Sequence, residues 1–412
     1  MSIIRRITIK ESEDCFSKFN FNSKLLHNLQ KVGFHSLKDI QKQAIPLILA
    51  GKDIVAVAQT GSGKTAAFCL PIINNLLLMG AKRKEKTSYA LILVPTRELA
   101  MQIENDIKSF INGTHLSLTL MVGGISKIPQ IKKISTGTDI LVATPGRLLD
   151  LLQEQHVKLD EVNFLVLDEA DRMLDMGFIP DILKILKYVK KDSQKLLFSA
   201  TMPTEIVKLS KQIVKQAVYV EVSPQGSVKK TIEQKIYYLP HVLKKQFLAF
   251  LLSKPSWKSI IIFVRTKYSA DGLARILAKY GFNSSVIHGN KSQKARQDNL
   301  NNFKNGLSRI LIATDIVARG IDIAGVDLVI NYDLPDQADN YVHRIGRTAR
   351  NEKSGVAITL CDLEKEKDKL IAIEKLIKEK IKEEKIPEEF SVKVKKTNNR
   401  SSSSRKYKNK KI

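Results

Sequence analysis

The sequence is short of cysteine, of acidic residues and of long apolar runs, and each shortage narrows what the chain can be. Its three cysteines, Cys15, Cys69 and Cys361, are too scattered for a paired zinc site or a redox dithiol. It has no stretch of about 20 apolar residues, and its first residues do not form an export signal. We therefore expect a cytoplasmic protein with reduced thiols and no membrane association.

Acidic residues are outnumbered by basic ones. Asp and Glu total 42 against 68 Lys and Arg, which gives a formal net charge of +26. Residues 391–412 carry nine basic residues and no acidic one, so this segment cannot bury a core and is predicted to be disordered. Positive charge on both the tail and the body favours a polyanionic partner, with nucleic acid as the first candidate.

What the chain does have is a regular alternation of short apolar runs and helical stretches. A length of 412 residues suggests two or three domains. The first series of runs lies at residues 54–57, 90–94, 118–122, 140–143, 164–167 and 196–198, and the second at 234–239, 259–264, 284–287, 310–313, 328–332 and 356–360. This alternation predicts an α/β fold with two doubly wound parallel sheets.

Composition also predicts the domain boundaries. We expect an N-terminal tail at 1–14, a first domain at 15–222, a linker at 223–233, a second domain at 234–385 and a basic disordered tail at 386–412. The linker contains Pro224, Gly226 and two lysines, which is typical of an exposed connection. Beyond Asp362, alternating Lys and Glu with apolar residues at helical spacing predict a solvated helix up to about Lys385.

Residues 58–65 read AQTGSGKT and stand between an apolar run and a helical stretch. This fits the P-loop pattern, in which Gly61 and Gly63 let backbone N–H groups turn toward phosphates. Lys64 would reach the terminal phosphates, and the Thr65 hydroxyl would take a magnesium ion. The pattern predicts a nucleotide site at the end of the first strand.

Three carboxylates follow the apolar run 164–167, in the sequence Asp168-Glu169-Ala170-Asp171. Carboxylates this dense at the end of a buried strand repel one another unless a cation balances them. Taken alone, a solvated acidic turn explains them equally well. With the P-loop upstream, magnesium bound to phosphates is the better interpretation. The second domain has no P-loop, so we expect it to close on the nucleotide that the first domain holds.

Eight motifs then occur in the order of one protein family: AQTGSGKT, PTRELA, GG, TPGR, DEAD, SAT, ATDIVARGID and HRIGRTAR. From about Phe16 to Leu360 the chain resembles the DEAD-box ATP-dependent RNA helicases, most of all the bacterial RhlE type. The resemblance implies two tandem RecA-like domains, ATP and Mg²⁺ as cofactors, and single-stranded or short duplex RNA as a partner read with little sequence specificity. We expect a monomer.

The resemblance implies a role for each matching residue. Nucleotide contacts would come from Phe16, Gln41, Ala58, Gln59, Thr60, Gly61, Ser62, Gly63, Lys64, Thr65 and Asp322. Within this set Phe16 and Gln41 belong to the adenine-recognising segment, and Asp322 meets the ribose. The catalytic set would be Lys64, Asp168, Glu169, Arg347 and Arg350. Glu169 would activate the attacking water, the two arginines would be arginine fingers, and Thr65 and Asp168 would hold Mg²⁺ largely through water and phosphates.

Further residues would couple hydrolysis to RNA. By the resemblance, Asp171 would hydrogen-bond to Ser199 and Thr201, while His343 and Arg344 would tie the two domains together. RNA contacts would come from Pro95, Thr96, Arg97, Gly123, Gly124, Thr144, Gly146, Arg147, Arg265, Gly289 and Thr314. These residue types address phosphates and sugars rather than bases. The chain departs from the family at Leu37-Lys38, which puts in doubt how the adenine-reading loop is held, and at Ala349, where glycine is commoner.

The resulting expectation is local, poorly processive unwinding or remodelling of RNA duplexes and ribonucleoproteins, driven by ATP binding and hydrolysis. Ribosome assembly and RNA decay are the settings that fit, with ribosomal or RNA-decay proteins as partners. The alternative is an RNA-annealing or ribonucleoprotein-scaffolding chaperone in which ATP only times release. A DNA helicase is disfavoured by the resemblance alone.

Overall fold

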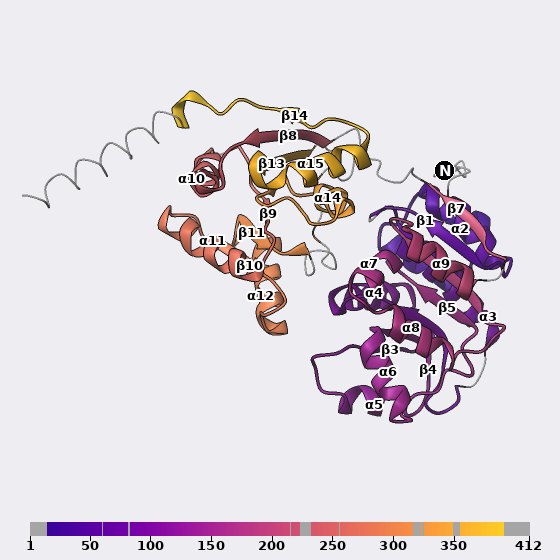
Figure 1. Ribbon diagram of the computed structural model, residues 1–412. Coiled ribbons are helices and arrows are strands. Elements are labelled where there is room, and N and C mark those ends of the chain that lie inside the picture. Colours follow the sequence, from indigo (N-terminus) through magenta and orange to yellow (C-terminus); the bar gives the residue numbers. More distant parts are fainter. Residues whose placement is uncertain are drawn as a thin grey trace, which may run out of the picture. The chain divides into compact units, whose positions relative to one another are not determined.

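A computed structural model describes residues 15–59, 61–80, 83–214, 216–222, 232–254, 256–315, 323, 325–348 and 355–390. The chain divides into two compact units, Met1–Gln225 and Gly226–Ile412, and the division falls inside the stretch expected to be a linker. Each unit is an α/β domain and is described by itself (Figure 1).

The first unit is built on a seven-stranded sheet in the order β3-β4-β2-β5-β6-β1-β7, with every pair parallel. Its strands are β1 (Ile54–Val57), β2 (Ser88–Leu93), β3 (Leu118–Met121), β4 (Thr138–Ala143), β5 (Phe164–Leu167), β6 (Gln194–Ser199) and β7 (Val218–Glu221). Its helices are η1 (Phe16–Phe19), α1 (Ser23–Lys31), α2 (Asp39–Leu49), α3 (Lys64–Met79), α4 (Arg97–Phe110), α5 (Ile128–Ile134), α6 (Pro145–Gln153), α7 (Ala170–Asp175), α8 (Ile179–Leu186) and α9 (Thr204–Ile213).

Both faces of this sheet are buried, which explains why its strands read as continuous apolar runs. In β1, Ile54 and Ala56 join a core with α1 to α4, whereas Val55 joins a core with α6 to α9 on the other face. The six strands expected from the sequence are all present. β7 was not expected, because it lies at the sheet edge and only Val220 of its four residues is buried.

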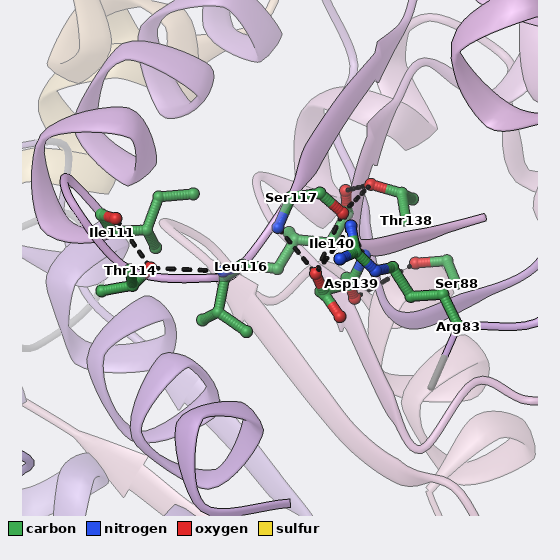
Figure 2. A network of polar contacts seen from close by, with 9 residues as sticks. All are labelled: Arg83, Ser88, Ile111, Thr114, Leu116, Ser117, Thr138, Asp139 and Ile140. Carbon is green, nitrogen blue, oxygen red and sulfur yellow. Dashed lines mark hydrogen bonds and ion pairs between the residues drawn. The ribbon is translucent and has the colours of Figure 1, made fainter. Parts of the chain in front are cut away.

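A polar network joins the amino ends of β2, β3 and β4 (Figure 2). Asp139 at the start of β4 is 4% exposed and accepts hydrogen bonds from the Ser117 backbone N–H at 2.6 Å and from the Ser117 hydroxyl at 2.9 Å. Arg83 adds an ion pair to the same carboxylate at 3.7 Å. The network ties the amino ends of these strands together, and the loops of the site lie at the opposite, carboxyl end of the sheet.

The second unit repeats the design with a seven-stranded parallel sheet in the order β10-β11-β9-β12-β13-β8-β14. Its strands are β8 (Ile232–Tyr238), β9 (Ile260–Phe263), β10 (Ser284–Ile287), β11 (Ile310–Ala313), β12 (Leu328–Asn331), β13 (Gly355–Cys361) and β14 (Lys382–Glu383). Its helices with described bounds are α10 (His241–Leu252), α11 (Lys267–Lys279), α12 (Gln293–Lys304), α14 (Ala338–Ile345) and α15 (Leu363–Ile377). Residues of α10 and α11 pack on one face, and those of α12, α14 and α15 on the other.

The end of the second unit differs from expectation in two ways. The helix predicted to reach about Lys385 stops at Ile377, because Lys378 adopts a left-handed conformation with φ 56°, and β14 then pairs with β8 (Figure 1). Residues 386–390 were expected to belong to the disordered tail, but Ile386 and Phe390 pack against the second unit. Phe390 is 4% exposed and packs against Phe247 and Phe250, with ring centroids 5.0 and 5.7 Å apart. Residues 391–412 lie outside the described part of the chain. Among the described helices, none combines the length and apolar character needed to span a membrane.

Candidate active site

The P-loop connects β1 to α3 at the carboxyl end of the first sheet. Gly63 is the residue before the helix and has φ 94°, a conformation that L side chains rarely adopt. A Cβ atom there would lie 2.6 Å from the Gln41 side-chain nitrogen, so the position requires glycine on both counts. Ala58, Gln59, Gly61 and Ser62 belong to the same turn, in which the Ser62 N–H donates to the Gln59 carbonyl at 3.2 Å. Thr60 is outside the described residues.

Lys64 is the first residue of α3 and carries the clearest sign of a ligand. Its side chain is only 6% exposed, and in the part of the chain that the structure describes its Nζ has no hydrogen-bond partner. A buried ammonium group without a partner is costly, whereas an anion at the positive end of a helix satisfies both the charge and the helix amides. The residues therefore fit the phosphates of a nucleotide.

Gln41 holds the P-loop in place from α2. Its Oε1 accepts from the Lys38 backbone N–H at 2.9 Å, and its Nε2 donates to the Gly63 carbonyl at 3.2 Å. Lys38 also donates through Nζ to the Gly61 carbonyl at 3.1 Å. Although this chain departs from the family at Leu37-Lys38, the bond from Lys38 to Gly61 helps to hold this segment. Phe16 is 4% exposed and packs edge-on against Phe34.

Asp168 and Glu169 follow β5 and are nearly fully buried, at 2% and 5% exposure. Burial raises the pKa of Asp168 to about 6; the nearby Lys64 ammonium opposes the rise, and Glu169 and Asp171 add to it. Glu169 has φ 55°, a strained backbone for a residue other than glycine, and its carboxylate pairs with the buried Arg172 guanidinium. The site therefore holds a buried carboxylate that gains from an added cation, beside a second carboxylate that is held in place.

Asp171 links β5 to the loop after β6. One carboxylate oxygen accepts from the Thr201 N–H at 2.8 Å and from the Thr201 hydroxyl at 2.9 Å. The Ser199 hydroxyl accepts from the backbone N–H of Asp171 at 3.2 Å. Both expected partners therefore contact Asp171, but Ser199 bonds to its backbone N–H and Thr201 to its carboxylate.

The residues expected to contact RNA lie beyond the neighbouring strands, at the carboxyl ends of β2, β4 and β3. Thr96 caps α4 by accepting from the Leu99 N–H at 3.3 Å. Arg147 donates to the Ile125 carbonyl at 3.1 Å, so it supports the loop that contains Gly123 and Gly124. Because the sheet order is β3-β4-β2-β5-β6-β1, the two sets of expected site residues occupy different halves of this edge. The half at β3, β4 and β2 holds the residues expected to contact RNA: Pro95, Thr96, Arg97, Gly123, Gly124, Thr144, Gly146 and Arg147. The half at β5, β6 and β1 holds the P-loop, Asp168, Glu169, Asp171, Ser199 and Thr201.

In the second unit, the residues expected to contact RNA also follow neighbouring strands. Arg265, Gly289 and Thr314 follow β9, β10 and β11, which are adjacent in the sheet. The Arg265 N–H donates to the Asp333 carboxylate at 2.9 Å, and the Thr314 N–H to the Ile287 carbonyl at 3.4 Å. Asp322 and Arg350 lie outside the described residues. Arg347 is 5% exposed and follows α14, which comes after β12 in the chain.

Arg344 lies inside the second unit. Its guanidinium is 1% exposed and makes a two-point ion pair with Asp315, at 2.6 and 2.7 Å. It also donates to the Asp333 carbonyl at 2.6 Å and lies over the Phe263 ring. The hydrogen bonds described for Arg344 all lie within its own unit, and its expected role in tying the two domains together stays a prediction. His343, its neighbour on α14, is half-buried.

Comparison with known proteins agrees with this arrangement. Residues 38–209 match the model of the DEAD/DEAH box helicase family, and residues 243–352 match the helicase conserved C-terminal domain. The RNA helicase RhpA of Helicobacter pylori is 40% identical over 352 residues, which are 84% of this chain and 70% of RhpA. A probable ATP-dependent RNA helicase, DDX4 of Pelophylax lessonae, is 41% identical over 366 residues, 87% of this chain and 51% of that protein.

This chain belongs to the DEAD-box RNA helicases. Members of this family are ATP-hydrolysing enzymes. Saccharomyces cerevisiae Dbp5 bound to RNA and ADP BeF3 superimposes with a TM-score of 0.81 and 31% identity, covering 94% of this chain and 99% of that one. A DEAD box protein of Methanococcus jannaschii gives a TM-score of 0.53 and 39% identity over 90% of this chain. The chain spans about half to three fifths of several curated relatives, such as DDX4 and the rice helicase 52A.

Two residues of this DEAD-box site were not expected from the sequence. Arg172 pairs with Glu169 three positions earlier, and this spacing on a helix is a signal that the sequence does carry. Lys38 supports the P-loop across 23 residues, and no local pattern predicts a contact over that separation. Both residues contact other protein groups rather than a ligand, so the ligand-binding motifs of the sequence do not include them.

Proposed function

We propose that this chain is an ATP-dependent RNA helicase that couples ATP binding and hydrolysis to local, poorly processive unwinding or remodelling of RNA. The observation that carries the proposal is the buried Lys64 ammonium, without a hydrogen-bond partner in the described ranges, near the buried Asp168 carboxylate, whose pKa is raised. A nucleotide phosphate with its cation satisfies both groups at once. The family membership supports the rest.

In the first unit Lys64 and the helix amides would bind phosphates, and Gln41 would read adenine while it supports the P-loop. No group of three or more metal-ligating side chains occurs in the described ranges. Mg²⁺ commonly takes only one or two carboxylates and completes its shell with phosphates and water, so Asp168 with Thr65 suits it. When bound, the ion would neutralise phosphate charge. Glu169, fixed by Arg172, would orient and deprotonate the attacking water.

In the second unit Arg347 and Arg350 would supply positive charge to the transferring phosphoryl group, and Asp322 would meet the ribose. We assign Arg344 a further role beside the one expected. With two bonds to Asp315 and one to Asp333, it would hold α14 and therefore the neighbouring Arg347 in place. His343, half-buried on the same helix, keeps the proposed role of linking the units.

RNA would lie along the other half of each sheet edge, over the loops after β2, β3 and β4 and after β9, β10 and β11. These loops offer hydroxyls, arginines and glycine amides, which contact phosphate and sugar without reading bases. Dbp5, the solved relative described above, is bound to RNA. The separation of the two halves of the sheet edge supports the proposal that the protein holds ATP and RNA at the same time.

The test is ATP hydrolysis with and without single-stranded RNA, in the parent and in Glu169→Gln. The substitution should keep ATP and RNA binding but lower RNA-stimulated hydrolysis about 100-fold, because the general base is lost. Glu161→Gln is the matched control, since Glu161 precedes the same strand and pairs with a surface lysine, Lys84. Hydrolysis by Glu169→Gln at the parent rate would show that the catalytic assignment is wrong.

The same assays address the alternatives. Strand annealing that persists without nucleotide would favour an RNA-annealing chaperone, and stimulation of hydrolysis by DNA as strongly as by RNA would favour a DNA helicase. The RhlE type, the cytoplasmic location, the monomeric state and a setting in ribosome assembly or RNA decay stay predictions of the sequence. Sequencing RNA crosslinked to the protein in cells would identify the targets.

A further inference from the structure

Residues 122–126, the loop that follows β3, are held by an amide side chain that no family motif above includes. Gln130, on α5, accepts through Oε1 from the Val122 N–H at 3.1 Å. Its Nε2 donates to the Val122 carbonyl at 3.2 Å and to the Ser126 carbonyl at 2.9 Å. One carboxamide therefore closes the loop at its first and last residues, and Gly123, Gly124 and Ile125 lie between.

The geometry of this contact is that of a structural clamp. Gln130 is 6% exposed, and all three bonds go to backbone groups. The Val122 N–H and carbonyl are paired as a neighbouring strand would pair them, at the point where β3 has already ended. A buried amide of this kind does not serve solubility, so it has either a packing role or a role in shaping the loop.

The loop needs such support because the two glycines at its centre do little to fix its conformation. Gly124 has φ +70°, and a Cβ there would lie 2.1 Å from the Arg97 guanidinium. Consecutive glycines lose more conformational entropy on ordering than other residues do. In the described part of the chain the N–H groups of Gly123 and Gly124 donate to no protein acceptor, and Gly124 is exposed. These amides are the groups the loop offers to an anion.

We propose that Gln130 is a positioning residue for RNA binding: it holds residues 122–126 in the conformation that presents the Gly123 and Gly124 amides to RNA phosphates. The inference rests on the RNA-binding role assigned to these glycines under the proposed function. Gln130 itself does not touch RNA. It acts by lowering the entropy that the loop would otherwise lose when RNA binds.

The test measures ATP hydrolysis against RNA concentration for Gln130→Leu and Gln130→Glu. Leucine fills similar space without hydrogen bonds. Glutamate keeps the acceptor for Val122 but turns an oxygen toward two carbonyls. Both variants should need about tenfold more RNA for half-maximal stimulation, equivalent to about 1.4 kcal/mol, and should reach the parent turnover number at saturating RNA.

Asn28→Leu is the matched control. Asn28 is also a buried amide of the first unit, 3% exposed, and donates to the Phe110 and Asn112 carbonyls at 2.8 and 2.9 Å. Thermal melting should register a loss of stability in all three variants, but the half-saturating RNA concentration should move only in the Gln130 variants. An equal shift in Asn28→Leu, or parent behaviour of Gln130→Glu, would overturn the inference.

Gly124→Ala separates failure of this inference from failure of the proposed function. The added methyl group is strained by the positive φ and meets Arg97, so it disturbs the loop directly. If Gly124→Ala raises the half-saturating RNA concentration and Gln130→Leu does not, the loop binds RNA but Gln130 does not position it. If neither variant changes it, the RNA-binding role of the loop is wrong as well.

Discussion

At the scale of single residues, the site keeps charged groups where burial disfavours them. Asp168 is 2% exposed and has a pKa raised to about 6, chiefly by burial and in spite of the nearby Lys64. An aspartate in an unfolded chain titrates near 4. Between these two values the folded state retains a proton that the unfolded chain has lost. Stability therefore falls as the pH rises from about 4 to about 6, and the full penalty applies above pH 6.

Asp168→Asn should therefore stabilise the protein in the absence of nucleotide while it abolishes ATP hydrolysis. Asparagine cannot ionise, and its side-chain oxygen can still accept from the Glu169 N–H, as Asp168 does at 2.9 Å. At pH 8 we expect a gain on the order of 1–3 kcal/mol and a melting temperature several degrees higher. Melting curves in EDTA between pH 5 and pH 8 check this.

The gain should shrink as the pH is lowered toward 5, because the parent carboxylate is then protonated. Asp160→Asn, at an exposed carboxylate just before β5, is the control and should show no such pH-dependent gain. If Asp168→Asn melts below the parent at every pH, Asp168 stabilises the fold and is not strained by burial.

The sequence predicted those residues whose chemistry is local. Lys64, Asp168 and Glu169 stand in short motifs, and each lies beyond a strand end as expected, while their catalytic roles stay predictions. The Gln130 contacts and the bonds of Arg344 within its own unit were missed for the same physical reason. A buried amide or guanidinium takes its role from the backbone groups that surround it after folding, and those groups come from distant positions in the chain, as with Arg344 and Asp315.

At the scale of elements, strand order separates the residues assigned to the two proposed ligands along one sheet edge. In the first unit the residues assigned to the nucleotide and to catalysis follow β1, β6 and β5, and those assigned to RNA follow β2, β4 and β3. The expected strands were correct because strands buried on both faces are uniformly apolar. β7 and β14 were missed because edge strands lack that pattern, and β14 has only two residues, both exposed.

The segment after α15 allows a prediction at this scale. A chain ending at Lys385 lacks Ile386 and Phe390, which pack against the second unit near Phe247 and Phe250. Loss of a buried aromatic side chain typically costs about 3 kcal/mol, so this chain should melt at a clearly lower temperature than one ending at Phe390. Equal melting temperatures for the two truncations would show that the packing of Phe390 adds no stability.

The chain ending at Phe390 in turn tests the basic segment 391–412. It should keep the parent turnover number and melting temperature but need more RNA for half-maximal stimulation. The slope of log affinity against log salt should flatten by about 0.7 for each RNA phosphate that the segment binds in the full-length protein. Superimposable slopes and half-saturation values for this chain and the full-length protein would leave the segment without a role in RNA binding.

At the scale of the whole molecule, two units of the same architecture carry complementary halves of the proposed chemistry. Only the first has a P-loop, and the second contributes buried arginines on and after α14. The repeated α/β alternation predicted both sheets. It could not predict that Arg344 is used inside its own unit, because that depends on the packing of α14 against β12 and the residues that follow it.

We propose that both units act on one nucleotide. It is tested most directly by Arg347→Ala, measured for ATP affinity and for RNA-stimulated turnover, with the exposed Arg275→Ala as the control. Arg347 lies far along the chain from Lys64 and should act mainly on the transition state. We expect RNA-stimulated turnover to be lost while the ATP dissociation constant changes little. An unchanged turnover number in Arg347→Ala would mean that the two units do not form a shared site.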